Sequence, residues 1–343
     1  MGFHGQRLIF LGALLGVCFG CSVHQLTGDT MTGYTREHLI PYTLEQGSLD
    51  SACALGLAMG GFLNSFERVT DSPHRAAVPT LVSASMCFEE AAWQHELSYL
   101  RAIRDGKAEL AMDARIRQQI AHQKVAQTLK TAYERTIAIF GEPSAEQCPN
   151  LETEEDEQLW LMGMVSGIQA VRHDGAAERT AGVSMDLPIK AMRGVRCLDN
   201  DRWWGAPKAL EAAMWVSVPG SQPTTGDASK KTPYQVIEDN LVLAEKAPIK
   251  MVFAVAAMVY ENAGDETMVK QMITRYGKSE ATSPAAHGKR LLGLHTRRQL
   301  RAASDRIWMK TVGHRTPVNK LGEFPRKTKP QETSEDDDLL NDI

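Results

Sequence analysis

Residues 232–266 read TPYQVIEDNLVLAEKAPIKMVFAVAAMVYENAGDE, and this stretch decides the fold class. Thr232 followed by Pro233 is a typical helix start, because threonine can cap a helix and proline fits its first position. Gly264-Asp265 then separates two short helices. The interval from Thr232 to Glu266 is about 34 residues, which is a period found in stacked helix pairs. One interval does not demonstrate a repeat, but it predicts a helix-turn-helix unit.

The same helical pattern extends in both directions. Ser48 is expected to cap one helix, Pro79 to open a second, and Thr153 to begin another, with a long helix from Ala108 to Phe140 between them. The second half is expected to hold helices near 188–197, 205–217, 232–246, 249–262, 266–277 and 287–313. No run of alternating strands appears. The predicted fold class is all-α: a bundle or solenoid of stacked helix pairs, tetratricopeptide-like in the second half.

The chain divides into four expected regions. Residues 1–21 form a signal, 22–180 an N-terminal helical region, 181–321 the tetratricopeptide-like region, and 322–343 a charged tail. The tail places Lys329 and Pro330 before a run of acids and carries little apolar surface. It is therefore expected to be disordered.

The first region predicts export. Arg7 precedes a ten-residue apolar run, residues 8–17, which is too short to span a bilayer core that needs about 20 apolar residues. The ending Gly20-Cys21 resembles a bacterial lipoprotein signal, which implies lipidation of Cys21 with a fatty acid such as palmitate. The alternative is an ordinary secretory signal cleaved nearby. Ser22, standing where Asp would resemble an inner-membrane retention signal, favours a periplasm-facing anchor in the outer membrane.

Composition sets the remaining limits. The 343 residues are 43% hydrophobic and 23% charged, which suits a globular chain with a large core. The net charge of −4 predicts no bulk attraction to nucleic acid. Four cysteines follow Cys21, and an exported chain can oxidise them. Cys148 and Cys197 both adjoin turn-like segments and are the favoured pair, while four free thiols remain the alternative.

A series of turn and aromatic residues carries a resemblance to a known family. The series is Trp203-Trp204-Gly205-Ala206, Val218-Pro219-Gly220, Pro223, Gly226-Asp227 and Lys230. In it, residues 200–247 resemble the T-component (TatT) family of periplasmic TRAP-transporter lipoproteins. The resemblance implies a helical protein with tetratricopeptide-like repeats. It also implies association with a transporter substrate-binding protein and passage of a small apolar ligand.

Three tryptophans are the candidate partner- or ligand-binding residues. Trp204 and Trp215 are eleven positions apart, which places them near one face if both lie on one helix. Trp203 and Trp204 are adjacent, so at most one of them is expected to pack fully into a helix seam. Aromatic side chains often anchor interfaces. Packing between repeats is the alternative role for all three.

No specific catalytic or metal-binding pattern is present. Glu90 and His95 share a predicted helix and define a hydrolase alternative, without a zinc-protease or di-iron spacing. His287 and His295 lack a third metal ligand. Gly163 and Gly167 flank a serine that is misplaced for a nucleophile elbow, so they predict a close helix contact. The sequence therefore predicts a non-enzyme without metal or cofactor.

The expected function is that of an accessory or scaffold lipoprotein near a TRAP-type transport system, with a protein partner. The rival is a small-molecule-binding helical protein that works alone, and a homo-oligomer is left open. The basic helix at 287–313 has three candidate roles: capping the last repeat, contacting anionic lipid, or pairing with the acidic tail or a partner.

Overall fold

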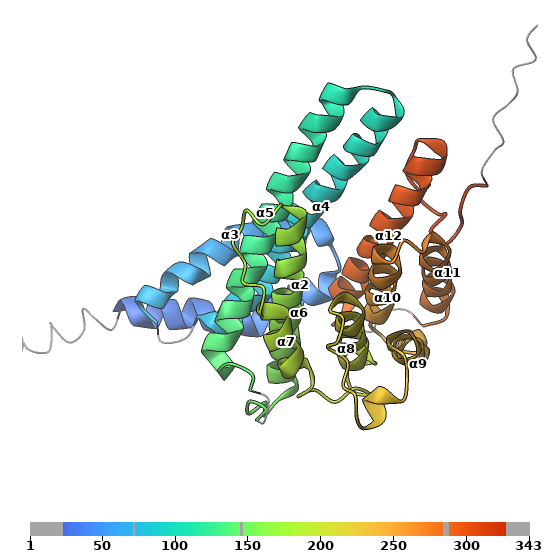
Figure 1. Ribbon diagram of the computed structural model, residues 1–343. Helices are drawn as coiled ribbons and strands as arrows, with labels where there is room; N and C mark the ends of the chain where they lie inside the picture. Colours follow the sequence, from blue (N-terminus) through green and yellow to red (C-terminus); the bar gives the residue numbers. More distant parts are fainter. Residues whose placement is uncertain (1–22, 71–72, 145–146, 284–287, 327–343) are drawn as a thin grey trace, which may run out of the picture.

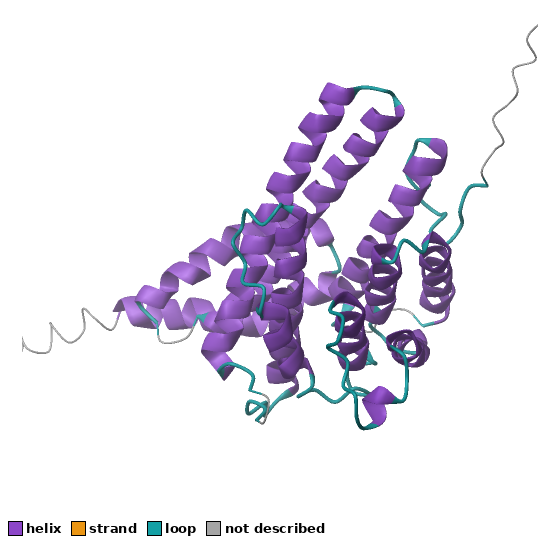
Figure 2. Cartoon of the chain, in the orientation of Figure 1, coloured by secondary structure: helices purple, strands orange, loops and turns teal. Residues whose placement is uncertain are grey.

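The computed structural model describes residues 23–70, 73–144, 147–283 and 288–326, and within these ranges it contains helices and no strand (Figures 1 and 2). The all-α prediction is confirmed. The predicted signal with Cys21, His287 and residues 327–343 lie outside the described residues. Among the described helices, none combines the length and the apolar character needed to cross a membrane.

The first half is built from long helices. Residues 23–34 are helical and lead into a π-helical turn. The elements that follow are η1 (Thr35–Leu39), α2 (Ile40–Gln46), α3 (Leu49–Ser65), η2 (Phe66–Arg68), α4 (His74–Arg104), α5 (Ala108–Phe140) and α6 (Glu154–Ala176). Ser48 caps α3 and Thr153 caps α6, both as predicted.

The second half contains shorter helices. They are α7 (Leu187–Val195), α8 (Ala206–Ser217), η3 (Asp227–Ser229), α9 (Pro233–Glu245), α10 (Met251–Asn262), α11 (Glu266–Thr282) and α12 (Arg290–Val312). Thr232 caps α9 and forms a capping box with Gln235. Gly264 has φ 73°, a left-handed conformation that separates α10 from α11. The helix starts read from the sequence are thus within a few residues of the observed ones.

The prediction that Pro79 opens a helix is wrong. Pro79 lies inside α4, which begins at His74. An interior proline removes one helix hydrogen bond and costs about 3 kcal/mol. Next to it α3 crosses α4 closely, because a Cβ added to Gly56 would lie 2.6 Å from the Thr80 carbonyl oxygen. Tertiary packing at this crossing therefore stabilises a helix that local sequence alone would interrupt.

The helices from α5 onward share one hydrophobic core, and a second, small cluster joins α3 to α4. Consecutive helices from α3 to α6 pack side by side, and α12 returns to contact α4 and α2 as well as α10. One hydrophobic cluster extends from Val125 to Ile307. The boundary predicted between residues 180 and 181 therefore does not separate two cores. Helix α7 contacts both α6 and α8, so packing continues across this point of the chain.

Glycines allow α5 and α6 to approach each other closely. A Cβ on Gly163 would collide with the Thr136 side chain, and one on Gly167 would lie 2.7 Å from the Tyr133 ring. The predicted close helix contact is confirmed. It brings α6 against the middle of the bundle, where α6 can form one wall of the site described below.

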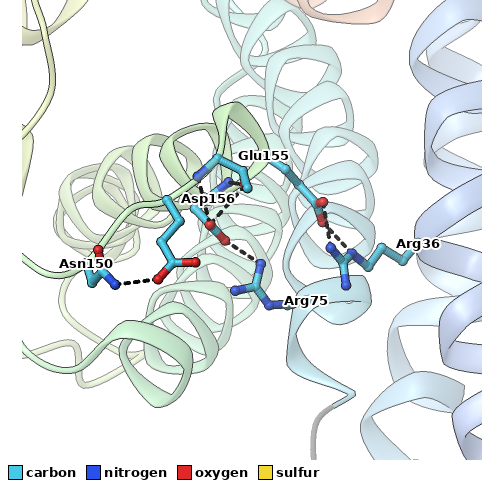
Figure 3. A network of polar contacts seen from close by, with 7 residues as sticks. Arg36, Arg75, Asn150, Glu155 and Asp156 are labelled. Carbon is cyan, nitrogen blue, oxygen red and sulfur yellow. Dashed lines mark hydrogen bonds and ion pairs between the residues drawn. The ribbon is translucent and has the colours of Figure 1, made fainter.

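The first turn of α6 joins distant segments through four consecutive acids. Glu154 binds Lys289 at 2.9 Å, Glu155 binds Arg36 at 2.6 Å and Asp156 binds Arg75 at 2.5 Å. Figure 3 shows the last two pairs. Glu157 accepts hydrogen bonds from the Arg202 guanidinium and from Trp203 Nε1, at 2.9 and 2.7 Å. These acids suit the positive end of the helix dipole and also fix four segments around it.

Two disulfides crosslink the described chain. Cys148 and Cys197 are joined with their Cα atoms 5.4 Å apart, which is the favoured pair. Cys53 and Cys87 are joined with a Cα separation of 5.2 Å. The free-thiol alternative for these four residues is therefore wrong. The second bridge connects α3 to α4 beside the close crossing at Gly56, where two helix interiors come near enough for a bond.

Basic residues of α12 bind acids of the body. Arg298 pairs with Glu90 of α4, and Arg306 pairs with Glu96 of α4 and Glu261 of α10. Arg297 pairs with Glu280 of α11 at 3.3 Å. These contacts do not test the three roles expected for the basic helix. They arise because α12 packs against α4, α10 and α11.

The start of the disordered tail is predicted too early in the sequence. Residues 322–326 are described, and Phe324 packs against the hydrophobic core. The Gly322 carbonyl accepts a hydrogen bond from Thr274 Oγ1 at 2.8 Å, and the Glu323 carbonyl accepts one from Trp308 Nε1 at 3.1 Å. Composition could not show these contacts, because they satisfy backbone groups through helices far away in the sequence.

Candidate functional site

A cavity of about 190 Å³ lies between α4, α6, α10 and α12. Helix α6 lines it from Gln158 to Arg172 at steps of three or four residues. Fourteen residues of helix rise by about 21 Å, so the lining is elongated along α6. Its lining combines α4 and α6 of the first half with α10 and α12 of the second.

The two ends of the cavity differ. One end is near the start of α6, because the lining residues Trp203 and Lys289 bind the acids of its first turn. The other end is near the last turns of α6 and is lined by Arg172, Arg306 and Glu261. An aromatic end and a charged end are therefore separated by about the length of α6.

Most of the wall between the ends is apolar. The lining side chains of this kind include Val82, Met86, Trp93, Leu161, Met162, Val165, Ile249, Met251, Met258, Leu292 and Leu300. Methionine fills irregular gaps and adapts to different shapes. An apolar wall with a few polar groups is typical of small-molecule sites.

Two of the three candidate tryptophans line the cavity, and the third packs in the core. Trp203 is 3% exposed and lines the cavity, and Trp204 is half-buried and also lines it. Trp215 is 7% exposed, packs in the core and does not line the cavity, so its expected binding role is wrong. Trp204 and Trp215 do not share a helix face, because Trp204 precedes α8 and is not on the same helix as Trp215.

Trp204 has an unusual backbone. Its φ is 55°, a left-handed conformation that bulky residues rarely adopt. Its ring packs edge-on against Trp203, with centroids 5.5 Å apart, and the Lys289 ammonium lies 4.9 Å from its centroid. As predicted, the two neighbouring tryptophans do not both pack fully. The turn at residues 201–205 separates them, not the 100° rotation of a helix.

A buried polar chain reaches the cavity wall. Nδ1 of His122 lies 2.8 Å from Nδ1 of His173, and Nε2 of His173 lies 3.3 Å from Oε1 of Glu89. The other Glu89 oxygen lies 3.8 Å from Nε2 of His295. Glu89 and His295 line the cavity, while His122 and His173 lie behind them in the core.

The pKa values in this chain indicate which groups are charged. Burial opposes ionisation of Glu89, but the contact with His173 and the charges of His295 and Arg172 hold its pKa at about 2. Burial, together with the charges of His173 and Arg172, lowers the pKa of His122 to about 3. Burial also lowers the pKa of His173. At neutral pH the arrangement is therefore an ionised carboxylate backed by two neutral imidazoles.

Arg172 is the lining cation without an acidic partner. Its side chain is accessible, and Nη1 donates to Gln169 Oε1 at 3.1 Å and lies 3.3 Å from Met258 Sδ. No carboxylate of the described residues lies within 4 Å of it, whereas Lys289 and Arg306 both have one. Desolvation by the surrounding protein atoms lowers its pKa, while the negative charges of Glu89, Glu261 and Glu96 act in the opposite direction.

The hydrolase alternative is not assembled by the structure. Glu90 binds Arg298 and Gln94, and no interaction joins it to His95 among the described residues. His295 faces Glu89, while its expected companion His287 is not described. Within the described ranges, no group of three or more histidines, cysteines and acids is arranged to hold a metal ion.

Sequence reasoning does not identify Arg172, and it assigns Glu89, like Glu90, His95 and Glu96, to a solvated helix face and not to a site. Glu89 and Arg172 are both charged residues inside apolar helical stripes, the first beside Phe88 and the second beside Val171. The available signal was the spacing of Gln158, Met162, Val165, Gln169 and Arg172, which lie on one face of α6. A charge at the end of such a face has to meet a partner or a cavity. Which of the two it meets depends on the other three helices.

Comparisons with known proteins return no match: no family model and no curated protein matches the sequence, and no solved structure matches this chain.

Proposed function

We propose that this chain is a non-catalytic, exported and lipid-anchored protein that holds a small, elongated, largely apolar molecule between α4, α6, α10 and α12. The cavity is the observation that carries the proposal. Its free volume exceeds the roughly 150 Å³ of an engineered apolar cavity that binds benzene. Export and anchoring rest on the Gly20-Cys21 ending of the signal.

Binding of 1-decanol tests this function. A ligand at 100 times its Kd stabilises the folded state by about 2.7 kcal/mol, so the Tm should rise with decanol concentration. Ala254→Phe places a ring at the α10 wall of the cavity and should remove this rise. Ala138→Phe, at an exposed position of α5, is the matched control and should retain it.

The stability of each variant without ligand is measured first, by thermal unfolding, so that binding is compared between folded proteins. The cavity has no binding role if decanol leaves the wild-type Tm unchanged at every concentration. The same conclusion follows if Ala254→Phe and the wild type respond equally.

A second candidate is the accessory role at a TRAP-type transporter, with a periplasmic substrate-binding protein as the partner. An exposed apolar stripe on α5 favours it: Met112, Ile116 and Ile120 are 63%, 48% and 48% exposed at four-residue steps. Helices α4 and α5 project together away from the rest of the body (Figure 1). Exposed apolar surface of this kind typically marks a protein contact.

A photocrosslinker at position 116 tests this role in living cells. It should capture one predominant envelope protein, identified by mass spectrometry, whereas a crosslinker at the exposed Arg193 of α7 should not. Equal, diffuse labelling from the two positions would exclude the stripe as a specific docking surface.

A further inference from the structure

The charged end of the cavity contains a guanidinium with unused hydrogen-bond donors. A guanidinium carries five N–H donors, and in Arg172 only Nη1 has a partner among the described residues. Its two contacts there are a neutral amide oxygen and a thioether sulfur. Nε and Nη2 are the edge that binds carboxylates in a two-bond fork. Among the described residues, no protein acceptor occupies this edge.

The charges of Glu89, Glu261 and Glu96 act on Arg172, but none of these three acids forms an ion pair with it. Glu89 lines the same cavity, but Oε1 is directed at His173 and Oε2 at His295. Glu261, which also lines it, is held by Arg306 through two hydrogen bonds, at 2.8 and 2.6 Å. Each nearby carboxylate thus has a cation or an imidazole of its own.

The shape of the cavity restricts the rest of the ligand. Apolar residues line the wall from Arg172 toward Trp203 over about 20 Å. A free volume of about 190 Å³ lies along this elongated lining. A thin, extended chain fits such a lining better than a wide ring system.

We infer that the ligand is a linear amphipathic carboxylate, an inference that rests on the proposed binding function. Its head accepts two hydrogen bonds from Arg172, and its alkyl chain runs along α6 toward Trp203 and Trp204. The Arg172 edge, the engaged state of Glu89 and Glu261, and the length of the lining all support this assignment.

Calorimetric titration with matched C10 probes tests the inference. Decanoate should bind at least tenfold more tightly than 1-decanol, and decylammonium should bind more weakly than both. Arg172→Gln should weaken decanoate binding about 10- to 100-fold, the loss expected for charge-assisted hydrogen bonds, and should weaken decanol binding much less, because a neutral hydroxyl accepts a weaker bond. Arg172→Lys keeps the charge without the fork and should recover only part of the affinity.

The control is Arg193→Gln, which removes an exposed positive charge on α7 away from the cavity and should change neither affinity. 1-Adamantanecarboxylate has the same head on a wide cage and should bind more weakly than decanoate.

Equal affinities for decanoate and decanol, or tightest binding of decylammonium, would overturn the carboxylate assignment while the binding function stands. Equal binding of the adamantane acid would overturn the linear shape. Failure of all four probes would instead remove the proposed function.

Discussion

Replacement of Trp203 by alanine should lower the free energy of unfolding by about 3–5 kcal/mol, the usual cost of truncating a buried tryptophan. Trp203 is 3% exposed and belongs to the main hydrophobic cluster. Its Nε1 donates to Glu157, so truncation also leaves that partly buried carboxylate with one bond fewer. Chemical denaturation monitored by circular dichroism measures the change.

Trp204→Ala is the matched partner in this experiment and should cost only about 1 kcal/mol. Its ring is half-buried and contacts Trp203 edge-on, a pairing worth about 0.5–1.5 kcal/mol. Because the ring lines the cavity, this variant should still weaken binding of the decyl probes. If both variants unfold the protein equally, the aromatic pair is structural, and the cavity is not entered from this end.

Acidification should destabilise the protein by about 3 kcal/mol between pH 7 and pH 4 through His122 alone. The pKa of His122 is lowered from 6.5 to about 3, so the unfolded state binds this proton first as the pH falls. Stability is therefore lost progressively from about pH 6.5 toward pH 3, at about 1.36 kcal/mol per pH unit in the middle of the window. The lowered pKa of His173 adds a loss of the same sign.

Glu89 acts in a different pH window. Its pKa in the folded state is about 2, compared with 4.5 ordinarily, so its contribution is present above pH 4.5 and is lost as the pH falls toward 2. The pH 7 to pH 4 interval therefore mainly reports the histidines. Unfolding free energies measured by urea titration at several pH values separate the two windows.

His122→Asn keeps a nitrogen near the position of Nδ1 and cannot take up a proton. It should flatten the pH dependence of the free energy of unfolding between pH 6.5 and pH 4, even if it lowers stability at pH 7. His38→Gln, at an exposed position, is the control and should leave the slope as in the wild type. An unchanged slope in His122→Asn would mean that His122 is not the neutral, buried group that the structure indicates.

The sequence by itself determined the helices and many of their ends. Thr153 and Thr232 were identified as caps because a side-chain oxygen three residues before a backbone N–H is a local arrangement. The long helix from Ala108 to Phe140 followed from its apolar spacing and the glycine after it. Gly163 and Gly167 were identified as a close contact because small residues at helical spacing leave room for a neighbour.

Only the tertiary structure decided what the helices make together. The acids at the start of α6 suit the helix dipole, which is a local effect, but their partners lie up to 135 residues away. Trp204 was placed on a helix face with Trp215, whereas a left-handed turn places it in the cavity. Glu89 and Arg172 belong to one site because α12 returns to α4 and encloses the space between them. Helix periodicity reports which face of a segment is apolar, but it does not report which distant segment covers that face or where the cover is incomplete.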